Sequence, residues 1–164
     1  MSEDRLQYPP AVAELLAQMP LAPLGPGTPV VAVRPRIAAL AGTIPPTCLA
    51  GLWLAFHFLD ESHTLSQDLP SVEGSYWHGI LHRREPDAAN AAYWFRRVGR
   101  HPIFEPLRHR AAELGYAVKG HTWDPFAFIE ACEAHRGKGN AEEERLRQVQ
   151  QAEWELLFAW CFQR

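Results

Sequence analysis

Residues 48–56 read Cys-Leu-Ala-Gly-Leu-Trp-Leu-Ala-Phe, an unbroken apolar run of nine residues. At helical spacing, apolar side chains fall on both sides of this run, with Trp53 and Phe56 on one face and Leu54 on the other. A helix that is apolar all round is covered by its neighbours. The run therefore predicts a buried core helix over about 47–59, in an all-α protein.

The surrounding region, 37–59, carries no charged side chain over 23 residues, which is long enough to cross a bilayer. Two adjacent prolines divide it, and three polar side chains interrupt it, at Thr43, Thr47 and His57. We interpret it as a core helix rather than a membrane span, and expect no membrane association.

The overall composition is that of a folded globular protein. The chain has 164 residues, 47% hydrophobic and 21% charged, which excludes a disordered or collagen-like chain and suits one domain. Three cysteines without a C-x-x-C pair argue against a secreted disulfide framework. The polar N-terminus lacks the basic-then-apolar order of a signal peptide. These features predict a cytoplasmic protein.

Helix start and stop signals divide most of the chain into helical segments. Ser71 and Asp87 are suitable N-caps, and Gly99 is a suitable stop signal. The segments expected to be helical are 10–19, 47–59, 72–84, 88–98, 102–114, 125–135 (capped by Thr122 or Asp124) and 141–162. Residues 30–33 favour either a short strand or the beginning of another helix. Residues 1–164 are thus predicted to form a single-domain helical bundle of six to seven helices, with the Pro-rich segment 1–35 packed on it.

Charge is distributed unevenly along the chain. Residues 71–110 hold seven arginines against four acidic residues, together with four of the eight histidines, whereas the whole chain has a net charge of −3. A basic block between acidic flanks is an electrostatic indication about partners. We therefore expect the functional site in this block.

A candidate metal site begins at His78 and His82, four residues apart on the expected helix 72–84. Their side chains point the same way and could share one metal ion. Glu85 is a candidate third ligand or general base. The alternative is structural, with one histidine packed and hydrogen-bonded and the other solvated.

A second cluster precedes the first and holds His57, Glu61 and His63. His57 and Glu61 would share a helix face if the core helix continues for one more turn. Antiparallel packing of the two helices would bring this cluster towards His78. Histidine and carboxylate ligands suit Zn, Mn, Fe or Ni. The alternative is an ordinary helix C-terminus, where the helix dipole favours histidine.

Arginine forks bind carboxylates and phosphates, so the basic block also predicts a pocket for a small anion. The candidate substrate-binding residues are Arg84, Asn90, Tyr93, Arg97, Arg100 and His101. The alternative is that the arginines pair with nearby acidic residues on a solvated face. Aromatic residues between arginines superficially fit a nucleic-acid stacking platform. The expected burial of Trp77 and the acidic total argue against nucleic acid.

The block from Tyr76-Trp77-His78 to Arg100-His101-Pro102 resembles a family of short, uncharacterised proteins of bacteria and fungi. The shared pattern is YWHxxxHRRExDxxNAxYWFRRxGxHP, and the resemblance extends over about 45 residues, 59–104. No activity, cofactor or substrate is established for that family. The resemblance therefore implies no function and transfers no site residue.

Two functions follow from these residues. The first is a metal-dependent, hydrolase-like enzyme that acts on an anionic small molecule, with the metal activating water and Glu85 as catalytic base. His78 and His82 would be ligands, and His57, His63 or Glu61 would complete the set. The second is a non-enzymatic module that binds an anion or a partner protein, with structural histidines. A polar network that only fixes helix packing is a further alternative.

Overall fold

The structure is a computed structural model that describes residues 6–164. Within this part of the chain all regular structure is helical, in nine α-helices and one short 3-10 helix. The elements are α1 (Pro10–Gln18), η1 (Val31–Val33), α2 (Arg34–Ala38), α3 (Pro46–Ala55), α4 (Leu59–Gln67), α5 (Val72–Arg84), α6 (Ala88–Val98), α7 (Phe104–Glu113), α8 (Pro125–His135) and α9 (Ala141–Phe162). The all-α fold is confirmed. The expected number of six to seven helices is too low, because α2 and α4 are separate helices.

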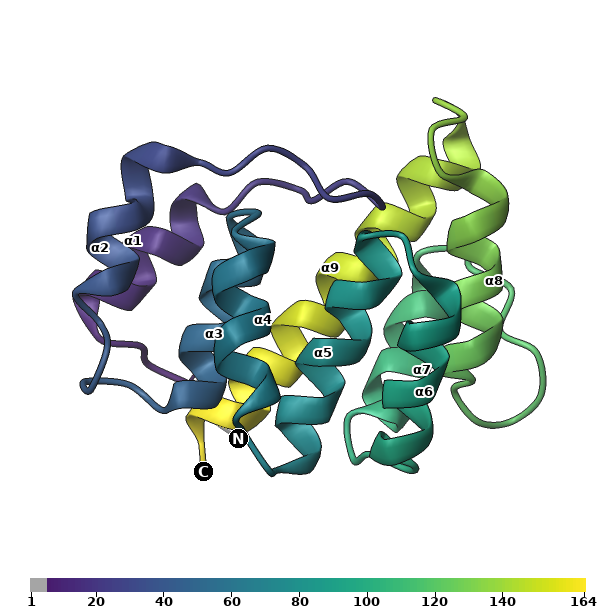
Figure 1. The fold of residues 1–164 in the computed structure, drawn as a ribbon. Helices are drawn as coiled ribbons and strands as arrows, with labels where there is room; N and C mark the ends of the chain where they lie inside the picture. The colour runs from purple at the N-terminus through teal and green to yellow at the C-terminus, as the bar shows by residue number, and fades with distance from the viewer. Residues whose placement is uncertain (1–5) are drawn as a thin grey trace.

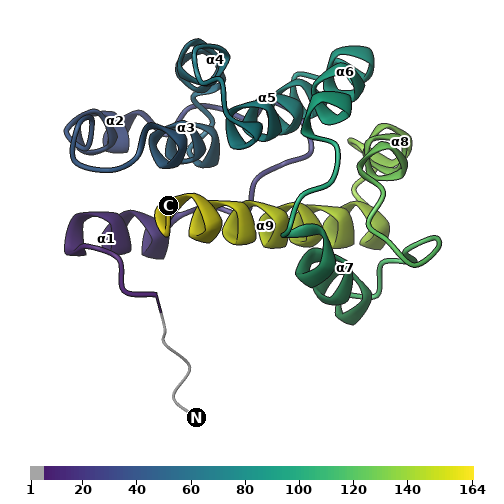
Figure 2. The same cartoon turned by 90° about the horizontal axis from the view of Figure 1, so that it is seen from below.

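The helices are arranged in two layers (Figures 1 and 2). α2, α3, α5 and α6 follow one another in one layer, with α4 on its outer side, whereas α1 and the long α9 lie in the other. α7 and α8 close the end of the bundle that lies farthest from α1. None of the helices described combines the length and the apolar character needed to cross a bilayer.

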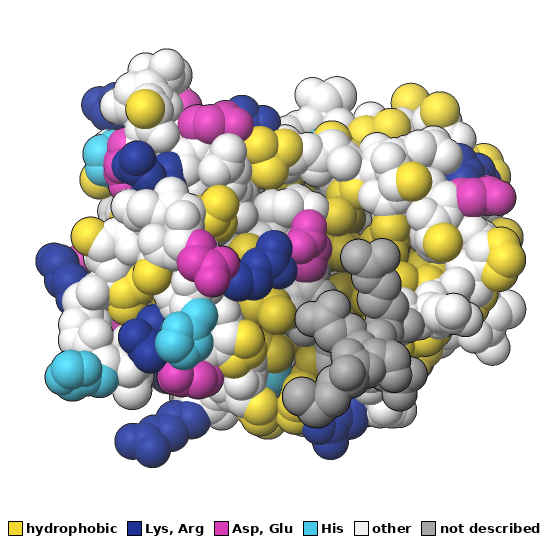
Figure 3. All heavy atoms as spheres, turned by 180° about the vertical axis from the view of Figure 1, so that it is seen from behind, with side chains coloured by type: hydrophobic (Ala, Val, Ile, Leu, Met, Phe, Trp, Pro, Cys, Tyr) yellow, Lys and Arg dark blue, Asp and Glu magenta, His cyan; other side chains and the backbone are white. Residues whose placement is uncertain are grey.

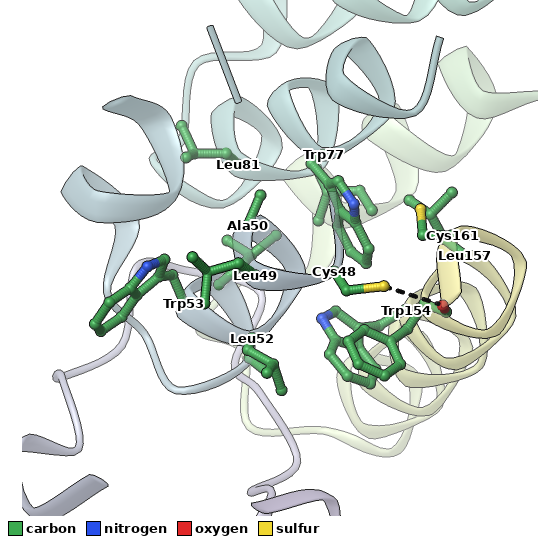
Figure 4. Packing of buried hydrophobic residues seen from close by; sticks show 14 of the residues in the cluster. Cys48, Leu49, Ala50, Leu52, Trp53, Trp77, Leu81, Trp154, Leu157 and Cys161 are labelled. Carbon is green, nitrogen blue, oxygen red and sulfur yellow. Dashed lines mark hydrogen bonds between the residues drawn. The ribbon is translucent and has the colours of Figure 1, made fainter. Parts of the chain in front are cut away.

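The core lies between α3, α5 and α9. Every residue of α3 from Cys48 to Ala55 is buried, which confirms the expected core helix. Figure 4 shows side chains of the three helices pointing toward one another around Trp77 and Trp154. Gly51 permits the close approach, because a Cβ there would lie 2.7 Å from the Trp77 ring. The indole N–H of Trp154 donates to the Gly51 carbonyl at 2.8 Å.

The core helix ends earlier than the expected residue 59. His57 has φ 70, the left-handed conformation, and stands just after the end of α3. The N–H of Phe58 donates to the Trp53 carbonyl at 2.8 Å and that of His57 to the Leu54 carbonyl at 3.1 Å. These two bonds form the Schellman motif that closes many helices. His57 occupies the position usually taken by glycine, and the chain turns there into α4.

Local signals predicted the other helix ends well. The side chains of Ser71 and Asp87 accept N-capping hydrogen bonds from the N–H groups of Gly74 and Asn90. Asp124, and not Thr122, caps α8. Val31–Val33 form η1 and α2 begins at Arg34, so the helix alternative for residues 30–33 is confirmed and the strand alternative is wrong.

The Pro-rich connector between α1 and η1 is held by long side chains of the bundle. Its carbonyl groups have no helical partners, and they accept hydrogen bonds from Arg84, Arg136, Arg147 and Gln150. These bonds seat the connector on α5 and α9. Residues 1–5 of the expected N-terminal segment lie outside the described residues.

The surface is uneven in charge (Figure 3). Seen from behind, charged side chains gather on the half of the molecule formed by α7, α8 and the start of α9. The half formed by α1 and α2 presents mainly apolar and uncharged atoms.

Candidate metal centre

Three histidines meet between α4 and α5. His78 and His82 lie one turn apart on α5, and His63 faces them from α4. The ring centroids of His63 and His78 are 4.6 Å apart, and those of His78 and His82 are 4.8 Å apart. One ring nitrogen from each histidine lies within 4.8 Å of the other two. The structure thus brings together three of the five expected metal ligands.

Neighbouring side chains hold two of these rings. A carboxylate oxygen of Glu85 lies 2.7 Å from Nδ1 of His82, and the amide nitrogen of Asn90 lies 3.4 Å from the same atom. The ring of His78 stacks on Trp94, with centroids 3.9 Å apart and an angle of 9° between the planes. A carboxylate on one imidazole nitrogen orients the other one, as it does for metal-binding histidines.

The environment keeps His78 neutral. Its side chain is only 2% exposed, and burial lowers its pKa to about 4, with further lowering from His82 and His63. Neutral imidazole is the form that binds metal ions. The buried Nδ1 of His78 has no hydrogen-bond partner in the described part of the chain. An unpartnered buried nitrogen is costly, and a metal ion is one group that would satisfy the ring.

The cluster extends from the interior to the surface. His63 is half-buried, and the side chain of Glu85 is 38% exposed. His82, Glu85 and Asp87 form a second set of donors, also within 4.8 Å of one another, that reaches the surface.

His57 and Glu61 lie outside this cluster. The expectation that they share a helix face is wrong, because His57 stands in the turn after α3. Its Nδ1 accepts a hydrogen bond from the Arg84 guanidinium at 2.8 Å. Burial and the Arg84 charge lower the pKa of His57 to about 4. Glu61 pairs with Arg34 at 2.7 Å.

The side chains of Arg84 and His101 are buried and form hydrogen bonds with other groups of the protein. The Arg84 guanidinium is buried, and it donates to the carbonyls of Gly25, Pro26 and Leu54 as well as to His57. Burial lowers its pKa to about 9. His101 is held between a carboxylate oxygen of Glu73 (3.1 Å) and the N–H of Ile103, which donates to Nδ1 (3.2 Å). The structure does not direct either side chain toward the histidine cluster.

The remaining candidate substrate-binding residues lie at different positions along α6 or just beyond its end. Asn90 lies at its start, beside His82, and Tyr93 is 45% exposed. The Arg97 guanidinium lies 5.3 Å from the centre of the Trp94 ring. Arg100 lies beyond the far end of α6, whose 11 residues span about 16 Å. Sequence reasoning missed Trp94, although its spacing of four residues from Asn90 places both on one helix face.

Comparisons of the chain with protein-family models, with curated proteins and with solved structures found no match. The chemistry is therefore argued from the geometry of the cluster. Three histidine nitrogen donors are typical of metal sites that keep one position for water or substrate. A metal ion in such a site polarises bound water and generates a nucleophile near neutral pH.

Proposed function

We propose that the protein binds one divalent transition metal ion (Zn, Mn, Fe or Ni) through His63, His78 and His82, and uses it to hydrolyse a small anionic molecule. The observation that carries this proposal is the meeting of three ring nitrogens, from two helices, within 4.8 Å. Metal–nitrogen bonds of about 2.0–2.1 Å with tetrahedral angles place two nitrogens about 3.4 Å apart. Small side-chain rotations would bring the three rings to that spacing.

In this proposal the main role of Glu85 is to position the ring of His82. Its bond to His82 Nδ1 leaves Nε2 of the same ring for the metal. The carboxylate is also our candidate for the base that accepts a proton from metal-bound water, and in that role it would have to leave Nδ1 of His82, which faces away from a metal on Nε2. Asn90, beside His82, and Arg97, beside Trp94, are our candidates for binding an anionic substrate.

A non-enzymatic module with structural histidines is the second candidate. It is favoured by the packing of the rings, since His78 stacks on Trp94 and His82 bonds to Glu85, and both contacts are made between side chains of the protein. The two candidates differ in one measurable property, the binding of a transition metal.

The test uses untagged protein, with binding of Zn²⁺, Mn²⁺, Ni²⁺ and anaerobic Fe²⁺ followed by calorimetry and by the melting temperature. We expect about one equivalent of at least one metal, and a rise in melting temperature, since a ligand that binds only the folded state stabilises it. His63→Gln removes one of the three proposed ligands and should abolish both effects. His63 is half-buried, so the substitution spares the core. His109→Gln is the matched control, since its side chain is 62% exposed.

Less than about a tenth of an equivalent of every metal, with no rise in melting temperature, would contradict the metal centre. Hydrolysis is assayed separately, on phosphate and carboxylate esters with the loaded protein. Metal binding without hydrolysis of any of these esters would contradict the hydrolase while leaving the metal centre in place. Hydrolysis that His63→Gln leaves unchanged would contradict the assignment of the site.

A further inference from the structure

A surface hollow of about 500 Å³ lies at the end of the bundle opposite the histidine cluster along α6. It is formed by the connection between α6 and α7, the connection between α7 and α8, and the first residues of both following helices. Pockets for small molecules commonly have volumes of about 300–1,000 Å³. The hollow has the size of a ligand site, and no residue of the proposed metal centre lines it.

The charges in the hollow favour an anion. Arg100 and Lys119 both line it, and no carboxylate in the described part of the chain lies within 4.0 Å of their charged groups. The two acidic residues in the lining are already engaged. Glu105 accepts hydrogen bonds from Arg108 and His109, and Asp124 caps α8. The cationic groups therefore remain available to a ligand.

Two helices begin at the rim of the hollow and add to its positive potential. α7 starts at Phe104 and α8 at Pro125, and both residues line the hollow. The N-terminus of a helix carries a partial positive charge and exposes N–H groups. The α7 N-terminus has no side-chain cap. An anion near Arg100 would thus also meet this helix end.

The wall of the hollow is aromatic. Phe104 and Trp123 line it, and Phe126 keeps 38% of its surface exposed there. Trp123 is only 4% exposed, and its Nε1–H is buried without a hydrogen-bond partner in the described residues. Buried donors in native proteins are normally satisfied. This nitrogen is itself out of reach of solvent, so a ligand in the hollow would contact the carbon edge or face of the indole ring.

We propose that this hollow binds a small anion with a flat aromatic body, an aryl carboxylate or an aryl phosphate. Arg100 and Lys119 hold the anionic group, and Phe104, Trp123 and Phe126 hold the aromatic body. The proposal does not depend on the metal centre, and it assigns Arg100 to a different site from the histidines.

The test uses 2-naphthoate and 1-naphthyl phosphate as probes, with neutral 2-naphthamide and inorganic phosphate as comparisons. Binding is followed by calorimetry and by the indole N–H signals in ¹H–¹⁵N spectra, in which Trp123→Phe identifies the Trp123 signal. We expect the aryl anions to bind at least tenfold more tightly than either comparison and to shift the Trp123 signal. The comparison between naphthoate and naphthyl phosphate shows which anionic group is preferred.

The double variant Arg100→Ala, Lys119→Ala should weaken aryl-anion binding at least tenfold. Arg96→Ala, Lys138→Ala is the matched control, because it removes the same charge at two exposed positions that do not line the hollow. Absence of binding at millimolar probe would overturn the proposal. Equal weakening by both double variants, or equal affinity for naphthamide, would overturn it as well. None of the substituted residues lies in the histidine cluster, so these outcomes do not bear on metal binding.

Discussion

The imidazole of His78 lies flat against the indole of Trp94, with ring centroids 3.9 Å apart and planes 9° apart. The contact joins α5 to α6, and the third ring, His63 of α4, meets His78 edge-on at 4.6 Å. The orientation of His78 is therefore set by packing against two other helices. A ring held in place before metal binding loses little entropy when the metal binds, which is the advantage of a preorganised site.

Replacing Trp94 should loosen this ring and weaken the proposed metal binding. We expect Trp94→Leu to lower metal affinity about tenfold, at the lower end of the effect of supporting residues around metal sites. Calorimetric titration with Zn²⁺ measures it. Tyr93→Leu is the control, since Tyr93 is exposed and stacks on Trp94 only at its edge. Equal affinities in both variants would mean that the stack does not position His78.

The helix caps were predictable from the sequence, because they depend on groups two to four residues apart. Ser71, Asp87 and Asn140 each accept a hydrogen bond from an N–H group three residues further along. The left-handed Gly99 after α6 is likewise a local effect, since glycine adopts a positive φ without strain. Such signals need no knowledge of the tertiary structure.

α4 was missed because its core-facing side carries no apolar pattern. Its buried residues are Ser62 and Ser66, and the Ser62 hydroxyl donates to the Ala50 carbonyl at 2.9 Å. Small polar side chains allow α4 to lie close to α3, but they give no hydrophobic periodicity in the sequence. The sequence also gives no signal for the left-handed conformation of His57, which separates α3 from α4, since glycine usually occupies that position.

The candidate site was predictable only in part, for a related reason. Helical spacing alone pairs His78 with His82, whereas the addition of His63 requires the packing of α4 on α5. Arg84 was expected in a pocket for a small anion, because arginine forks bind carboxylates and phosphates. Its partners are main-chain carbonyls and His57, and a sequence does not show which carbonyls lack partners.

His57 should make the protein less stable at mildly acidic pH. Its pKa in the folded state is lowered to about 4, by burial and by Arg84, so the unfolded chain binds this proton first as the pH falls. Histidine in an unfolded chain has a pKa near 6.5. The free energy of unfolding should therefore decrease between about pH 6.5 and pH 4, and this group has no effect above that range.

Urea unfolding of wild type and His57→Asn, at several pH values from 7.5 to 4.5, measures this effect. Asparagine tolerates the left-handed conformation and keeps a hydrogen-bond acceptor for Arg84, but it does not titrate. We expect wild type to lose more stability than the variant as the pH falls. Parallel curves would show that His57 takes up no extra proton on unfolding.

Two glycines inside helices should resist replacement by alanine. Alanine normally stabilises a helix interior by about 1 kcal/mol relative to glycine. A Cβ at Gly51 would lie 2.7 Å from Trp77, however, and one at Gly79 would lie 2.8 Å from Phe95. Overpacking of this kind costs about 1–3 kcal/mol, so we expect Gly51→Ala and Gly79→Ala to destabilise the protein.

Thermal unfolding of these two variants is compared with that of Ala13→Gly, at an exposed interior position of α1. At that exposed position no contact with an aromatic ring opposes the helix preference, so glycine should lower the free energy of unfolding by about 1 kcal/mol. If either glycine-to-alanine variant raised the melting temperature, the contact with the aromatic ring would not limit the approach of the helices.

The ion pair between Arg83 and Glu153 should be far more sensitive than the exposed ion pairs. Both side chains are fully buried, with 2.6 Å between Nη2 and Oε1, and the Tyr76 hydroxyl donates to the other carboxylate oxygen at 3.0 Å. Glu153→Gln leaves the guanidinium charge buried without its counter-charge, which costs about 3–5 kcal/mol. Glu155→Gln removes one partner of the half-exposed pair with Arg110 and should cost less than about 1 kcal/mol. Urea unfolding at pH 7 compares the two variants, and equal small losses would mean that water reaches Arg83 when its partner is neutral.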